Sequence, residues 1–271
     1  MEEPLLRHSI LNTIRSLKVK FSDEYGELIL CLDGKDYWRR KDFPYYKAAR
    51  VTAKEKSEFD WKNIYAFIDK IKLELDMFFP YKQVNVNTAE ADDIIAVLCR
   101  RFGAESSEEL GGLNIGEKVL IISGDHDFKQ LQKYGNVSQY DPINKKFIRC
   151  LNPELFLKEH IIRGDVGDGV PNFLSDDDCF VNHKRQKSLS KKNVKKWLGE
   201  EPNTFCVTGE LKNKWIRNTY LINFDFIPDE VSEEITKVFE EQQNLKKDRS
   251  KLMNYLIENR LKALLENIQD F

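Results

Sequence analysis

Three short acidic motifs and one further aspartate offer carboxylates in the number and spacing that a metal site needs. They are Glu90-Ala-Asp92-Asp93, Ser123-Gly-Asp125-His-Asp127, Gly164-Asp165-Val-Gly-Asp168, and Asp33. Taken singly, each has a structural explanation, because acidic first turns of helices and Gly-Asp turns are common. Carboxylates that converge repel one another and raise each other's pKa unless cations neutralise them. We therefore expect divalent cations, and ligation by oxygen alone favours Mg²⁺ or Mn²⁺ over zinc.

Such a site suits the hydrolysis of phosphodiesters. Two divalent ions can activate a water, hold the phosphate and stabilise the leaving oxygen. The net charge is only −2, but basic residues crowd into 39–56 and 184–196, apart from the acidic motifs. This distribution predicts basic surfaces beside an acidic pocket. A metal-dependent nuclease needs both, because the cations of the pocket recruit the phosphate that its carboxylates would repel.

The elements that must position these carboxylates alternate between strands and helices. Apolar runs predict strands over 27–32, 82–86, 119–123 and 137–140. Helical spacing predicts helices over 5–17, 61–78, 89–101 and 128–133, with Asp60 and Thr88 as N-caps. Alternation of this kind indicates an α/β domain with a mostly parallel central sheet, which binds ligands at the C-terminal ends of its strands. Asp33 and Asp125 fall at that edge.

The second half of the sequence is helical. Helices are predicted over 153–162, 191–198, 211–221, 229–242 and 248–268. We expect a nuclease-like α/β domain over 1–150 and a helical domain over 151–271. The connector 223–228 is aromatic and is expected to pack in the core, and the basic, aromatic stretch 35–58 is expected to be an exposed, partly helical excursion.

Composition excludes several protein classes. The 271 residues are 41% hydrophobic and 32% charged, and no apolar run approaches the ~20 residues of a membrane span. The N-terminal sequence lacks the features of a signal peptide, so we expect a cytoplasmic protein. We also expect it to be a monomer. Five scattered cysteines without a C-x-x-C motif indicate reduced thiols. Cys179 and His183 have zinc-like spacing, but two ligands do not make a tetrahedral site.

The acidic motifs resemble those of the flap endonuclease superfamily in their order and approximate spacing. Two further stretches, 37–50 (Y-W-R-R-K-D-F-P-Y-Y-K-A-A-R) and 221–229 (L-I-N-F-D-F-I-P-D), are similar to its ribonuclease H branch in T-even-type bacteriophages. The likeness extends from the first helix to the C-terminus. It implies two Mg²⁺ ions, for which Mn²⁺ is expected to substitute. The first would be held by Asp33, Asp92 and Asp125, with Glu90 and Asp93 nearby, and the second by Asp127, Asp165 and Asp168, partly through water.

The same resemblance assigns roles to basic residues. The stretch 35–58 would arch over the substrate's 5′ end, with Tyr46, Lys47 and Arg50 at the scissile phosphate. Aromatic side chains between basic ones also suit single-stranded nucleic acid on physical grounds, although a solvated basic helix is the plain alternative. The loop 164–171 would begin a helix-hairpin-helix-like unit that grips duplex phosphates. The expected nucleic-acid contacts are Arg39, Arg40, Lys41, Lys54, Gly167, Gly169, Lys184, Arg185, Lys187, Lys191, Lys192 and Lys195.

Two departures from the family pattern stand out. Members begin with a strand that carries another metal-binding aspartate, which by the resemblance lies upstream of this chain's first residue. Where many members have a glycine-rich hairpin, this chain has Asn-Phe-Leu-Ser-Asp-Asp-Asp at 172–178. We expect Asp176, Asp177 and Asp178 to form a solvated turn or helix start.

The resemblance implies a 5′ to 3′ exonuclease and flap endonuclease that removes RNA primers and DNA flaps in phage replication. Its substrates would be branched or 5′-flap DNA and RNA:DNA duplexes, with a phage single-stranded DNA-binding protein as a partner. The absence of the first aspartate keeps a second hypothesis open: a protein that binds branched DNA without cutting it. A small PIN-type ribonuclease would share the acidic pocket but would not account for the helical half.

Overall fold

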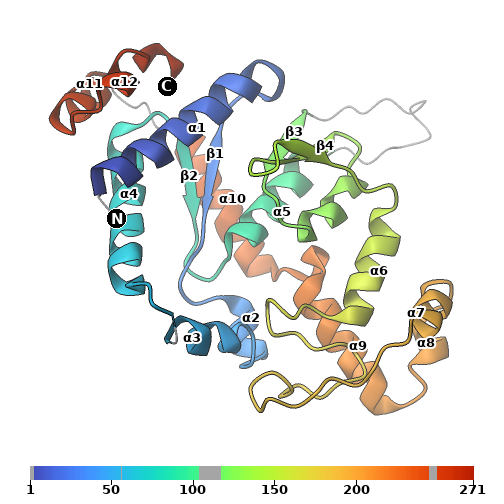
Figure 1. Cartoon of the computed structure of the whole chain (residues 1–271). Helices are drawn as coiled ribbons and strands as arrows, with labels where there is room; N and C mark the ends of the chain where they lie inside the picture. The colour runs from blue at the N-terminus through green and yellow to red at the C-terminus, as the bar shows by residue number, and fades with distance from the viewer. Residues whose placement is uncertain (1–2, 56, 104–116, 244–248) are drawn as a thin grey trace, which may run out of the picture.

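Among the residues that the structure describes, two small sheets carry the strands, instead of the single central sheet that the sequence predicts (Figure 1). The computed structural model describes residues 3–55, 57–103, 117–243 and 249–271. In one sheet β1 (Ile29–Leu32) runs parallel to β2 (Lys82–Asn85). In the other β3 (Val119–Ile122) runs parallel to β4 (Val137–Asp141). An unpredicted short strand, β5 (Lys146–Ile148), is antiparallel to β4. Helices flank both sheets, so the α/β class is confirmed and the single sheet is corrected.

A groove of about 700 Å³ lies between β1 and β3. Its walls include Ile14 and Phe21 of α1 (Glu3–Tyr25), Leu30 of β1 and Ile121 of β3. Within the described ranges, β1 is hydrogen-bonded only to β2, and β3 only to β4. Each of the two strands therefore has one edge without a strand partner there, and these edges border the same apolar groove.

Two helices begin with side-chain caps close to the predicted ones. The Asp60 side chain accepts a hydrogen bond from the Asn63 N–H and starts α4 (Trp61–Phe78), as the sequence predicts. Thr88 was wrong as the cap of the next helix. Glu90 is the N-cap of α5 (Ala91–Phe102), and its backbone N–H donates to the Asp93 carboxylate at 3.0 Å. This reciprocal capping sets the orientation of the first acidic motif.

The basic stretch contains two helices, α2 (Trp38–Asp42) and α3 (Ala48–Glu55), so it is partly helical as expected. It is not exposed throughout. Trp38, Phe43 and Tyr46 are buried, which corrects the expectation of an exposed excursion. Phe43 and Tyr46 pack with Ile161 from the second half of the chain. Lys56 lies outside the described residues.

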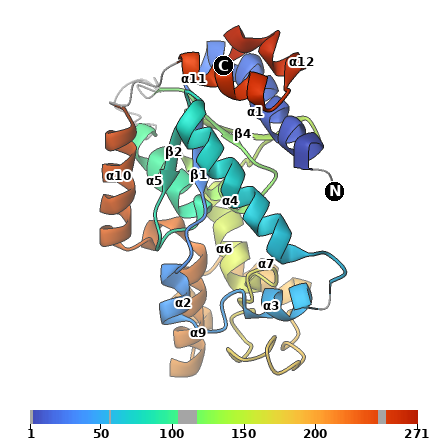
Figure 2. The same cartoon turned by 90° about the vertical axis from the view of Figure 1, so that its left-hand side faces the viewer.

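The second half is helical, and Figure 2 shows its last helices, α11 and α12, lying beside α1. The predicted helix over 248–268 is divided, with Arg260 at a φ of 55° in the break; Asp248 lies outside the described residues. The segment 127–133 is a 3-10 helix. The remaining elements are α6 (Pro153–Arg163), α7 (Lys191–Leu198), α8 (Pro202–Phe205), α9 (Gly209–Ile222), a 3-10 turn (Phe224–Phe226), α10 (Asp229–Gln243), α11 (Arg249–Glu258), α12 (Lys262–Leu265) and a 3-10 turn (Ile268–Asp270).

Hydrophobic packing joins the two halves. Val84 of β2 and Ile94 of α5 pack in one hydrophobic cluster with Phe224 and Phe239. Phe224 belongs to the connector 223–228, which was expected to pack in the core. A second cluster unites Leu11 of α1 with the C-terminal helices. The C-terminal half is therefore packed against the sheet region along much of its length. None of the helices in the described ranges is long and apolar enough to span a bilayer.

Candidate metal and nucleic-acid site

One pocket collects carboxylates from three separate segments of the chain. Glu90 and Asp92 come from the start of α5, Asp127 from the 3-10 helix after β3, and Asp165 and Asp168 from the loop after α6. All five were expected to be near metal ions. Asp33 and Asp125, which were expected at the same site, are exposed and do not line this pocket.

Asp92 connects this pocket to the two remaining aspartates. Burial raises the pKa of Asp92 to about 7; Lys47 opposes the shift, while the charges of Asp125, Glu90 and Asp33 add to it. Asp33 is held at the start of α5, where its carboxylate accepts a hydrogen bond from the Ala91 N–H at 2.9 Å. The negative charges of Asp33 and Asp125 therefore act on Asp92, although the two residues follow strands of different sheets.

Asp93 does not join the pocket. Its side chain is fully buried and caps the Glu90 N–H, and it accepts a hydrogen bond from the Trp38 indole at 3.1 Å. One carboxylate oxygen also lies 2.7 Å from the Arg39 guanidinium. The expectation of Asp93 beside the first ion is corrected, because the capping geometry turns its carboxylate into the core.

Arg39 is likewise internal. It is 2% exposed, its guanidinium lies 3.1 Å from Glu90, and its Nε donates to the Leu221 carbonyl at 2.8 Å. Neighbouring carboxylates, chiefly Asp93, outweigh the effect of burial and raise its pKa. Arg39 therefore stabilises the buried acidic residues, and the expected contact with nucleic acid is wrong for this side chain.

The three arch residues expected at the phosphate do meet the acidic loop. Lys47 forms ion pairs with Glu90 and, at 3.4 Å, with Asp168; its backbone has a left-handed φ of 55°, which is uncommon outside glycine. The Arg50 guanidinium lies 2.5 Å from Asp168 and donates to the Gly167 carbonyl. The Tyr46 hydroxyl lies 2.7 Å from both Glu90 and Asp168 and can donate to one of them at a time. Burial raises the pKa of Tyr46, so the phenol remains a neutral donor.

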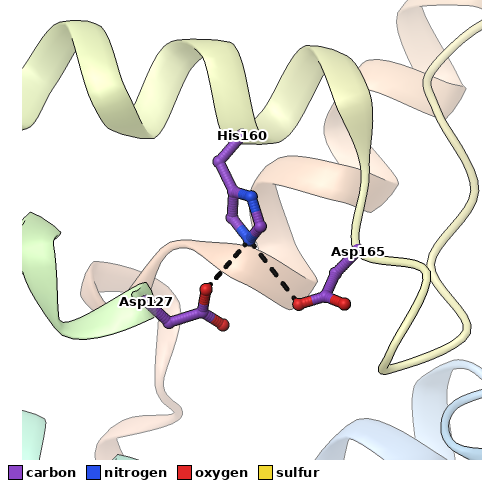
Figure 3. Close-up of side chains that lie close together, drawn as sticks. All are labelled: Asp127, His160 and Asp165. Atoms are coloured by element: carbon purple, nitrogen blue, oxygen red, sulfur yellow. Dashed lines mark ion pairs between the residues drawn. The ribbon is translucent and has the colours of Figure 1, made fainter. Parts of the chain in front are cut away.

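Sequence reasoning missed His160. It lies in the last turn of α6, and its Nε2 is 3.2 Å from Asp127 and 3.7 Å from Asp165 (Figure 3). One ligand atom from each of these three residues lies within 4.8 Å of the others. Burial opposes a charge on the imidazole, but the two aspartates outweigh it and raise the pKa of His160 to about 10. The sequence feature that could have identified His160 is its position five residues before Asp165, at the C-terminal end of a predicted helix.

The residues expected to contact nucleic acid differ in their exposure to solvent. Arg40, Lys41 and Lys54 are exposed in the arch, and Gly167 is exposed on the acidic loop. Gly169 is buried: its φ is 75°, and a Cβ there would come within 2.9 Å of the Tyr45 carbonyl oxygen. We therefore correct the expectation that Gly169 contacts DNA. The following basic residues are all exposed on or before α7: Lys184, Arg185, Lys187, Lys191, Lys192 and Lys195.

The three aspartates of the turn 176–178 were expected to be solvated. Each of them forms an ion pair with a basic side chain. Asp176 lies 2.7 Å from Lys214, and Asp178 lies 2.6 Å from Lys184. Asp177 forms an ion pair with Arg217. Cys179 and His183 belong to no group of three potential metal ligands in the described part of the chain.

The donor set of the pocket fits hard divalent cations. Carboxylate oxygens dominate it, and Asp92 has a raised pKa that a nearby cation would lower again. The Asp127, His160 and Asp165 group adds three ligand atoms that face one another. These residues can therefore hold metal ions, and the arch cations lie on the pocket's border, where a phosphate would be drawn.

Protein families and known proteins resemble this chain along most of its length. Residues 6–160 match the family described as 5′-3′ exonuclease, N-terminal resolvase-like domain, and residues 152–271 match the family described as T4 RNase H, C terminal. The chain is 32% identical to ribonuclease H of Enterobacteria phage T4 over 276 aligned positions, which cover 98% of this chain and 87% of that protein.

Solved structures of bacteriophage T5 proteins share the fold. One, co-crystallised with metal ions, has a TM-score of 0.62 at 18% identity and covers 88% of this chain and 91% of its own. A T5 flap endonuclease in a pseudo-enzyme–product complex with DNA and metal ions has a TM-score of 0.59 at 19% identity, with the same coverage. The T5 5′-exonuclease with bound zinc has a TM-score of 0.58 at 17% identity, covering 88% of this chain and 90% of its own.

Proposed function

Because this chain belongs to the 5′-3′ exonuclease family of the flap endonuclease superfamily and is a homologue of phage T4 ribonuclease H, we propose that it is a divalent-metal-dependent 5′ nuclease. Its substrates are 5′-flap or branched DNA and RNA:DNA duplexes. The reaction removes RNA primers and DNA flaps during phage replication, by hydrolysis of a phosphodiester bond.

The observation that carries this proposal is the convergence of carboxylates that lie far apart in the sequence. Asp92, Asp127, Asp165 and Asp168 line one pocket, and the charges of Asp33 and Asp125 act on Asp92. Such a concentration of negative charge is unfavourable in a buried site unless divalent cations bind there. Asp168 pairs with Lys47 and Arg50, and Asp127 and Asp165 lie near His160. Asp92 has no ion pair among the described residues, and its raised pKa marks the place where a cation would relieve the repulsion.

We assign Asp33, Asp92 and Asp125 to a first Mg²⁺ ion, and Asp127, Asp165 and Asp168 to a second. Ions in such sites supply a metal-activated water and stabilise the leaving oxygen. Glu90 acts differently in this proposal: it is held by Arg39, Tyr46 and Lys47, and it fixes the arch over the pocket.

Lys47 and Arg50 contribute the positive charge that the scissile phosphate requires. Both are paired with Asp168 in this structure, and half of the Arg50 side chain is exposed. A phosphate entering the pocket can therefore take over their hydrogen bonds. Exposed basic residues before and within α7, such as Lys187 and Lys191, hold the duplex through its phosphates without reading its bases.

A cleavage assay tests the proposal. A 5′-labelled flap substrate and an RNA:DNA duplex are incubated with Mg²⁺ and the full chain, the Asp125→Asn variant, and Glu233→Gln, a charge-neutralising control at an exposed position of α10. We expect cleavage by the full chain and the control, and a loss of at least about 100-fold in Asp125→Asn. Equal activity of both variants and the full chain would contradict the assigned site.

The second candidate function is binding of branched DNA without cleavage. The exposed basic surface and the T5 complex with DNA are compatible with either activity. Salt-dependent binding of forked DNA, with no product in Mg²⁺ or Mn²⁺, would favour this alternative.

A further inference from the structure

His160 introduces a nitrogen donor into a pocket whose other potential ligands are carboxylates. Figure 3 shows its imidazole pointing from α6 toward Asp127 and Asp165, which come from two other segments. The Nε2 atom lies 3.2 Å from an Asp127 oxygen and 3.7 Å from an Asp165 oxygen. All three ligand atoms lie within 4.8 Å of one another, so they surround a common point.

Each member of this group is held in place by its own element. The His160 ring stacks on Phe156, one turn earlier in α6, with ring centroids 5.9 Å apart and planes 11° from parallel. Asp165 uses its other oxygen to accept the Asp168 N–H at 3.0 Å. The Asp127 N–H donates to Asp125 at 3.0 Å. The donor atoms that face one another are therefore set by packing and backbone contacts.

The contact between His160 and the aspartates differs from an ordinary hydrogen-bonded ion pair. The Nε2 atom is buried, yet it has no hydrogen bond of regular geometry in the structure. By contrast, Arg163, on the same helix, makes a 2.7 Å hydrogen bond to Glu159. Two carboxylate oxygens and an imidazole nitrogen that face one point at ion-pair distance, without a regular hydrogen bond, can serve as ligands of a shared ion, which would displace the imidazole proton.

We propose that His160 is a ligand of the second metal ion and that this Asp-His-Asp set prefers a first-row transition-metal dication, such as Mn²⁺, over Mg²⁺. The inference rests on the proposed metal-dependent function and refines it. Imidazole binds borderline transition metals better than the hard Mg²⁺ ion, whereas carboxylates alone accept both. The set around Asp33, Asp92 and Asp125 has no histidine among the assigned ligands and remains suited to Mg²⁺.

The test uses Mn²⁺ and does not depend on cleavage. Electron spin echo envelope modulation of Mn²⁺ bound to the full chain detects a directly coordinated nitrogen. We expect this signal in the full chain and in His126→Gln, a matched control at an exposed histidine next to Asp127. The signal is expected to disappear in His160→Gln. Its absence from the full chain, or its persistence in His160→Gln, would overturn the proposal.

Calorimetric titration separates the ligand role from that of a counter-ion. A lost ligand lowers the Mn²⁺ affinity of the second site about 10- to 100-fold in His160→Gln, with a smaller effect on Mg²⁺. His160→Glu is expected to restore binding with a lower Mn²⁺ to Mg²⁺ preference. If His160 were only a cation that neutralises Asp127 and Asp165, its removal would instead strengthen binding of both ions.

If the full chain binds neither ion, the proposed function fails as well. If the full chain cleaves with Mg²⁺ and gives no nitrogen signal, only the role of His160 as a metal ligand fails.

Discussion

The guanidinium of Arg50 lies 2.5 Å from the carboxylate of Asp168, although 118 positions separate the two residues in the chain. This ion pair joins α3 to the acidic loop after α6. Because Asp168 also contacts Tyr46 and Lys47, the arch is fixed directly against the carboxylate pocket. Mutation of Arg50, Tyr46 or Lys47 can therefore test the contribution of each contact with Asp168 separately.

Arg50→Ala is expected to lower kcat on a 5′-flap substrate about 100-fold, because it removes positive charge at the scissile phosphate. The comparison variant is Arg40→Ala, which removes an exposed arginine that lies over the Tyr37 ring. That change is expected to weaken DNA binding with little effect on kcat. Single-turnover kinetics and fluorescence anisotropy measure the two quantities; similar kcat losses in both variants would contradict a specific role for Arg50.

The raised pKa of Asp92 predicts a pH-dependent stability of the metal-free protein. The folded state holds this proton up to a pH of about 7, whereas the unfolded state releases it near 3.8, the ordinary pKa of an aspartate. The stabilising contribution of the protonated form is therefore fully present below pH 3.8 and is lost as the pH rises to about 7. Asp92→Asn keeps the side chain neutral, so at pH 8 it is expected to raise the free energy of unfolding by on the order of 1 kcal/mol.

Urea denaturation in EDTA at several pH values measures this effect, with Asp92→Asn beside the full chain. The variant is also expected to lose Mg²⁺ binding, so it gains stability while losing its ligand. A variant that is less stable than the full chain at pH 8 would show that Asp92 is not strained by neighbouring charge.

Asp93 and Asp92 are adjacent but are expected to respond oppositely. Asp93→Asn leaves the buried Arg39 guanidinium with fewer charged partners and is expected to destabilise the fold by about 3 kcal/mol. The folded fraction is expected to bind Mg²⁺ as the full chain does, because Asp93 faces the core. Denaturation and calorimetry on the same samples test both parts, and a selective loss of Mg²⁺ binding would return Asp93 to the metal site.

The exposed lysines of α7 predict a salt-dependent grip on duplex DNA. Replacing Lys191, Lys192 and Lys195 with glutamine is expected to reduce the slope of log affinity against log salt by about 0.9 for each lysine that contacts a phosphate. The control carries Lys251→Gln and Lys262→Gln at exposed positions of α11 and α12. Anisotropy titrations over a range of salt concentrations provide the slopes, and equal slopes in both variants would place the duplex elsewhere.

Local sequence signals predicted the elements better than the directions of their side chains. Asp60 correctly marked the start of α4, because a short acidic side chain before an apolar periodic run is a strong N-cap signal. Thr88 offered a similar signal but was wrong, since the reciprocal bonds of Glu90 and Asp93 start α5 two residues later than predicted. The same capping placed Asp93 in the core, which spacing along the helix could not show.

Long-range contacts explain the remaining differences. The burial of Arg39 depends on Glu90, Asp93 and the Leu221 carbonyl, which no local pattern links to it. His160 was missed because a single histidine at a helix end has no motif, and its partners come from other segments. The convergence of the first two motifs was predictable, because each follows a strand at the same end of a parallel arrangement. The third motif follows α6, and no strand pattern places it in the pocket.

The apolar groove between β1 and β3 has a mechanical consequence for the carboxylate site. Asp33 follows β1 and Asp125 follows β3, so the two residues come from strands on opposite sides of the groove. Within the described ranges, no backbone hydrogen bonds of a sheet connect β1 to β3. The spacing of these two carboxylates is therefore set by the packing of both strands against α5, and an ion shared between them would connect the ends of β1 and β3 directly.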